Sequence, residues 1–71
     1  MINKEYFELY ETMLHSADSY NRRLAYGELL HYYKENEAVY YRTLSKSEKE
    51  WSPAQHHFIQ RMEKIKTLLE L

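Results

Sequence analysis

The stretch SADSYN, residues 16–21, decides how many helices this chain forms. Ser, Asp and Asn compete with helical hydrogen bonds and favour turns, so the stretch predicts a break, with Asp18 or Ser19 as the N-cap of the next helix. The opposing signal is a seam that crosses the stretch at spacings of four and three: Tyr6, Tyr10, Met13, Ala17, Tyr20 and Leu24. We favour the break, although no glycine or proline enforces it.

Helices are the expected elements on both sides of this stretch. The chain of 71 residues has one glycine, Gly27, and one proline, Pro53, whereas a strand-rich fold would need several turns built from such residues. The eight tyrosines favour strands and are the main contrary signal. Gly27 stands alone in a helical pattern, which predicts close helix packing at that point.

Three helices are predicted, at about residues 2–16, 20–44 and 52–70, within a single domain of residues 1–71. Along the first helix, apolar side chains recur at helical spacing: Ile2, Tyr6, Leu9, Tyr10 and Met13. We therefore predict an all-α fold, an antiparallel three-helix bundle. If the break at residues 16–21 is absent, the alternative is a long helical hairpin that dimerises to bury its stripe.

The second helix carries two tyrosine pairs in the sequence HYYKENEAVYYR, residues 31–42. Its main apolar stripe is predicted at Tyr26, Leu29, Leu30, Tyr33, Tyr40, Tyr41 and Leu44, with a second at Ala25, Tyr32 and Val39. Together the stripes cover about half of the circumference, which is wider than usual, so this helix has neighbours on two sides or carries an interface. Glu37 lies inside the arc and predicts either a polar partner or a helix break near Asn36.

The clearest helix boundary is Ser52-Pro53-Ala54-Gln55. Ser52 can cap the helix, proline suits its first position, and Gln55 completes a capping box. The predicted stripe of this third helix is Trp51, Gln55, Phe58, Met62, Ile65 and Leu69, widened by Ile59 and Leu68. Before it, Ser45 and Glu48 have the spacing of a second capping box and predict one extra turn.

No pattern in the chain predicts catalysis, a metal or another cofactor. Glu28, His31 and Glu35 share one ridge, but helical periodicity places it opposite the apolar stripe, where a solvated face is favoured over a metal site inside a bundle. His56 and His57 point about 100° apart, so they do not hold one ion together. There is no cysteine nucleophile and no glycine-rich phosphate loop.

The charge pattern leaves a protein partner as the favoured function. The net charge is −1, with Arg22-Arg23 and other basic residues interspersed with acidic ones, so a nucleic-acid partner is less favoured. No apolar run approaches the length of a membrane span and no signal peptide is predicted, so we expect a cytoplasmic protein.

We therefore expect a small regulatory or adaptor module without catalysis, one form of which is an inhibitor that docks on a larger protein. The expected partner-binding residues are aromatic: Tyr32, Tyr33, Tyr40, Tyr41 and Trp51. A homodimer is also expected, because a core this small needs added support. The alternative function is a small DNA-binding regulator of the helix-turn-helix type, which three short helices would suit in size.

Overall fold

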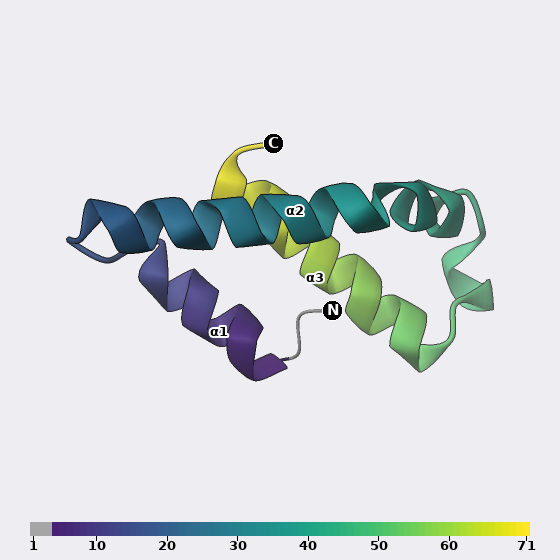
Figure 1. Ribbon diagram of the computed structural model, residues 1–71. Helices are drawn as coiled ribbons and strands as arrows, with labels where there is room; N and C mark the ends of the chain where they lie inside the picture. The colour runs from purple at the N-terminus through teal and green to yellow at the C-terminus, as the bar shows by residue number, and fades with distance from the viewer. Residues whose placement is uncertain (1–3) are drawn as a thin grey trace. The chain divides into compact units, whose positions relative to one another are not determined.

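The structure, a computed structural model, describes residues 4–71 and is all-α in that range, with no β-strand (Figure 1). The α-helices are α1 (Lys4–Met13), α2 (Ser19–Leu44) and α3 (Pro53–Leu69), and the 3-10 helix η1 (Glu48–Glu50) lies between the last two. The prediction of an all-α fold with three helices is confirmed for these residues. The predicted start of the first helix, with Ile2, lies outside the described residues.

The chain divides into two compact units at a point within α2. The first ends at Tyr32 and contains α1 and the first half of α2. The second runs from Tyr33 to Leu71 and contains the rest of α2, η1 and α3. The expectation of a single domain stays a prediction.

Asp18 starts α2 in the first unit. Its carboxylate accepts a hydrogen bond from the backbone N–H of Tyr20 at 2.9 Å, and its backbone carbonyl accepts a hydrogen bond from the backbone N–H of Arg22 at 3.2 Å. Asp18 is therefore the N-cap, as one of the two candidates predicted. The break is confirmed, and the alternative hairpin is wrong because it required one helix to continue through residues 16–21.

Arg22 satisfies the carbonyl groups that the break leaves free. Its guanidinium Nη1 donates to the backbone oxygens of Ser16 at 2.7 Å and Ala17 at 2.9 Å. Because an arginine has several donors, one side chain serves two carbonyls that a continuing helix would have used. The sequence analysis considered Arg22 only as one of several basic residues interspersed with acidic ones, and this local role was missed.

The buried face of α1 differs from the predicted stripe. Phe7 is the buried side chain of this helix, whereas Tyr6 is 55% and Leu9 50% exposed, so their predicted place in the core is wrong. The Tyr6 ring instead stacks on the Tyr10 ring, with centroids 6.5 Å apart. Apolar residues cover two neighbouring ridges of α1, and the phenyl ring, which has no hydroxyl group to solvate, is the one buried.

The helix α2 is continuous, so the alternative of a break near Asn36 is wrong. Glu37 is half-buried and finds a polar partner in Lys34, whose Nζ lies 4.0 Å from its Oε2. The buried residues of α2 are Ala25, Leu29, Tyr32, Tyr33, Tyr40 and Thr43. The predicted stripes are therefore partly wrong, because four of their members are well exposed: Tyr26, Val39, Tyr41 and Leu44.

Thr43 explains part of the difference between the predicted stripes and the buried face of α2. It is a buried polar residue, and its hydroxyl donates to the Val39 carbonyl one turn earlier, at 2.8 Å. A hydroxyl satisfied by its own helix can enter a core at low cost. A stripe drawn from apolar residues alone therefore misses this position.

Gly27 does not allow a close approach within the chain. A Cβ added there would meet no atom within 4 Å outside the neighbouring backbone, and the residue is exposed. The prediction of close helix packing at Gly27 is therefore wrong for the single chain.

The third helix begins and ends as its sequence dictates. The Ser52 hydroxyl accepts from the Gln55 N–H at 3.2 Å, the Gln55 side chain accepts from the Ser52 N–H at 2.8 Å, and the capping box is confirmed. At the other end Glu70 adopts the left-handed conformation, with φ 56° and ψ 43°. The buried residues of α3 are Ile59, Met62, Ile65 and Leu69.

Candidate functional site

The predicted contact residues divide into buried and exposed groups. Tyr32, Tyr33 and Tyr40 are 3–5% exposed, so their rings are buried in the protein's own interior. Tyr41 is 53% exposed, and Trp51 is half-buried. Of the four tyrosines that the sequence grouped together, Tyr41 alone offers a large accessible ring.

Three of these tyrosines form a connected cluster in the second unit. The ring centroid of Tyr40 lies 6.2 Å from that of Tyr33 and 5.2 Å from that of Tyr41, with both pairs tilted. A side-chain hydrogen bond joins Tyr33 to Tyr41. Tilted ring pairs at these distances are attractive beyond their buried area, so the cluster holds the exposed Tyr41 ring in place.

The environment of this cluster keeps Tyr33 protonated. Burial of its ring, the hydrogen bond with Tyr41 and nearby negative charge, including Glu37, raise the pKa of Tyr33 from 10.0 to about 12. Each cause disfavours a phenolate relative to the neutral hydroxyl group. At neutral pH the Tyr33 hydroxyl group is therefore neutral and acts as a hydrogen-bonding group.

Trp51 is bonded to the end of α2. Its indole Nε1 donates to the Thr43 carbonyl at 2.9 Å, and its ring meets His56 edge-on with centroids 5.1 Å apart. These contacts tie the connection between α2 and α3 to both helices. The extra turn predicted here is η1, but its N-cap is Ser47 and not Ser45, so the capping box predicted from Ser45 and Glu48 does not form. The Ser45 hydroxyl donates to the Arg42 carbonyl at 2.6 Å.

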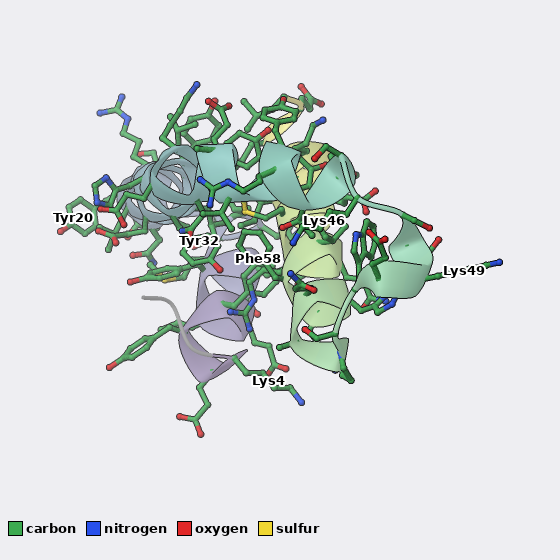
Figure 2. The ribbon with its side chains drawn as sticks, turned by 90° about the vertical axis from the view of Figure 1, so that its right-hand side faces the viewer. Lys4, Tyr20, Tyr32, Lys46, Lys49 and Phe58 are labelled. Atoms are coloured by element: carbon green, nitrogen blue, oxygen red, sulfur yellow. The ribbon has the colours of Figure 1, made fainter. Side chains whose placement is uncertain are left out.

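Several polar and aromatic residues of α2 and η1 are exposed. Figure 2 shows Tyr20, at the start of α2, and Lys49, in η1, extending away from the ribbon. The ridge of Glu28, His31 and Glu35 is exposed, as helical periodicity predicted. Within residues 4–71 no three side chains of the His, Cys, Asp and Glu types come together as a metal site.

A small cavity lies in the second unit at the C-terminal end of α3. It has a volume of about 260 Å³ and is lined by Tyr40, Glu63, Lys66, Thr67 and Leu71. The Lys66 Nζ lies 5.7 Å from the centroid of the Tyr40 ring. The cavity is a little smaller than the usual pocket for a small molecule, about 300–1,000 Å³, and its lining residues include neither a nucleophile paired with a base nor a set of metal ligands.

The comparisons with known proteins identify no relative. A scan against family models, a search of curated proteins and a search of solved structures each give no match. In the part of the chain that the structure describes, no helix is both long enough and apolar enough to cross a membrane.

Proposed function

We propose that this chain is a small non-catalytic protein-binding module, with regulatory or adaptor function, in which Tyr41 is the principal contact residue. The observation that carries the proposal is that Tyr41 is both accessible and held in place. The Tyr41 side chain is 53% exposed. It nevertheless makes a side-chain hydrogen bond with Tyr33, and its ring centroid lies 5.2 Å from that of Tyr40. An aromatic side chain that is ordered before binding loses little entropy when a partner covers it.

The neighbours of Tyr41 on α2 support a protein partner. Leu44, one turn further on, is 40% exposed and extends the apolar surface. Lys34 and Glu37, on the preceding turns, supply a pair of opposite charges at its edge. An apolar aromatic centre with a charged rim is the usual composition of a protein interface.

The other predicted contact residues have different roles in this proposal. Tyr33 and Tyr40 position Tyr41, and Tyr32 belongs to the interior of the chain. Trp51 is half-buried and bonded to Thr43, so it is a contact at the periphery. We also propose that the three helices form an antiparallel bundle and that the protein is a cytoplasmic homodimer. One form of the proposed function is an inhibitor that docks on a larger protein.

The test compares two exposed tyrosines of α2. Tyr41→Ser removes the proposed contact, and Tyr20→Ser, at a position 69% exposed, is the matched control. Immobilised wild-type chain and both variants are incubated with the nuclease-treated and untreated halves of a native lysate, and bound proteins are quantified by mass spectrometry. We expect a stoichiometric protein that the wild type and Tyr20→Ser retain and that Tyr41→Ser loses by at least about tenfold, the loss typical of an interface hot spot.

Two outcomes would contradict the proposal. One is equal retention of the bound protein by Tyr41→Ser, with circular dichroism showing that all three chains are folded. The other is that everything captured disappears after nuclease treatment, which would transfer the assignment to nucleic-acid binding.

A further inference from the structure

Six residues of α2 form a second seam that the buried face does not use. Their spacing alternates strictly between three and four residues, as in the core positions of a coiled coil: Gly27, Leu30, Lys34, Glu37, Tyr41 and Leu44. All six lie on one continuous helix, so their register follows from helical geometry alone. None of them is fully buried: the Lys34 and Glu37 side chains are 63% and 37% exposed, and Leu30 is half-buried.

The seam is complementary to itself when it is reversed. If two copies of α2 run antiparallel about a two-fold axis between Asn36 and Glu35, Lys34 of one lies opposite Glu37 of the other, and the reverse pair forms by symmetry. In a parallel pair, lysine would face lysine and glutamate would face glutamate, which is repulsive. Charge complementarity therefore selects the antiparallel arrangement of two identical helices.

The uncharged positions fit the same register. Leu30 of one copy lies opposite Tyr41 of the other, and Leu44 lies opposite Gly27. The open space around Gly27, where an added Cβ would meet nothing within 4 Å, is then the place that receives a leucine side chain. This pairing gives a reason for a glycine inside a helix, where it is otherwise unfavourable.

We propose that α2 pairs with α2 of a second copy of this chain, antiparallel, along the seam defined by these six residues. The inference rests on the proposed function, because Tyr41 and its neighbours belong to both surfaces, and it names the partner as the chain itself.

Charge variants of the full chain test the pairing by sedimentation equilibrium over a concentration series. Lys34→Glu places two glutamates opposite two glutamates in a homodimer, and Glu37→Lys places lysines opposite lysines. We expect the wild type to dimerise, each variant alone to dimerise at least about tenfold more weakly, and an equimolar mixture of the two variants to recover a heterodimer. A wild type that is monomeric throughout, or variants that dimerise as well as the wild type, would overturn the pairing.

Cysteine cross-linking tests the direction of the two helices. The chain has no cysteine, so Gly27→Cys and Leu44→Cys each introduce a unique thiol. Under mild oxidation we expect a cross-linked dimer from the mixture of the two variants and none from either variant alone. Cross-linking of each variant with itself would show parallel helices and overturn the proposed register.

The two proposals fail separately. A monomeric wild type whose captured protein is lost with Tyr41→Ser overturns self-pairing and leaves the binding of another protein intact. A dimer that the charge variants dissociate, in a chain that captures no other protein, supports self-pairing and contradicts the binding of a different partner.

Discussion

Gly27 lies in the interior of the long helix α2, is exposed, and as a glycine has no side chain. Glycine in a helix interior is unfavourable because it has more conformational freedom to lose on folding than any other residue. The free space around its Cα means that this cost is not offset by packing within the single chain. Gly27 therefore lowers the stability of the monomer, and in the proposed pairing it leaves room for a side chain of the second copy.

Gly27→Ala is expected to raise the free energy of unfolding of the monomer by about 0.5–1 kcal/mol, because alanine restricts the unfolded chain and its methyl group meets no neighbour. Urea unfolding followed by circular dichroism, at concentrations where the chain is monomeric, measures the change. Ala38→Gly, at another exposed position of α2, is the reverse control and is expected to lose a similar amount. Destabilisation by Gly27→Ala would show that the site is crowded within the chain.

At the scale of the element, the two longer helices each begin at side-chain hydrogen bonds. Asp18 begins α2, and the reciprocal bonds of Ser52 and Gln55 begin α3. The N-terminus of a helix leaves backbone N–H groups without partners, and such side chains satisfy them. The connection between α2 and α3 is held further by the indole bond of Trp51 to the last turn of α2.

Ser52→Ala is expected to lower the free energy of unfolding by about 1 kcal/mol, because it removes the oxygen that accepts from the Gln55 N–H. The matched control is Ser47→Ala, five residues earlier in the same connection. Ser47 precedes η1 but makes no capping hydrogen bond with its side chain, so its replacement should cost less than about 0.5 kcal/mol. Equal losses in urea unfolding of the two variants would contradict the assigned role of the capping box.

At the scale of the whole molecule, sequence reasoning succeeded at two helix boundaries whose physical cause is local, although the local capping box expected from Ser45 and Glu48 does not form. The break after α1 and the capping box of α3 depend on residues within a few positions of each other, and both were predicted correctly. The buried faces of α1 and α2 depend on which of two apolar ridges meets a neighbour, and no helical wheel contains that information. Phe7 was missed for this reason, and Thr43 was missed because the predicted stripe counted apolar residues only.

The candidate site follows the same division. The grouping of tyrosines on α2 was visible in the sequence, but the distinction between three buried rings and the exposed Tyr41 was not. The bond from Trp51 to Thr43 joins residues in different elements, so spacing could not reveal it. The seam of α2 with Gly27 and Glu37 became visible once the structure showed which face of the helix was already occupied.

Because of the tyrosine cluster, the free energy of unfolding of the whole molecule is expected to fall as the pH rises into the alkaline range. The pKa of Tyr33 is raised from 10.0 to about 12 in the folded chain, first by burial and then by the hydrogen bond with Tyr41. The unfolded chain therefore releases this proton first as the pH rises. The stabilising contribution is complete below pH 10.0 and is lost progressively as the pH rises to about 12.

We expect the free energy of unfolding, measured in urea at a series of pH values across this range, to fall less steeply in Tyr33→Phe than in the wild type. Tyr20→Phe, at an exposed tyrosine, is the control that retains the wild-type slope, since other groups that titrate in the same range affect both chains equally. Phenylalanine has no proton to release, so the difference between the two variants isolates the contribution of Tyr33. Identical slopes would mean that Tyr33 ionises equally easily in the folded and unfolded chains, and the cluster would then not hold its hydroxyl group as described.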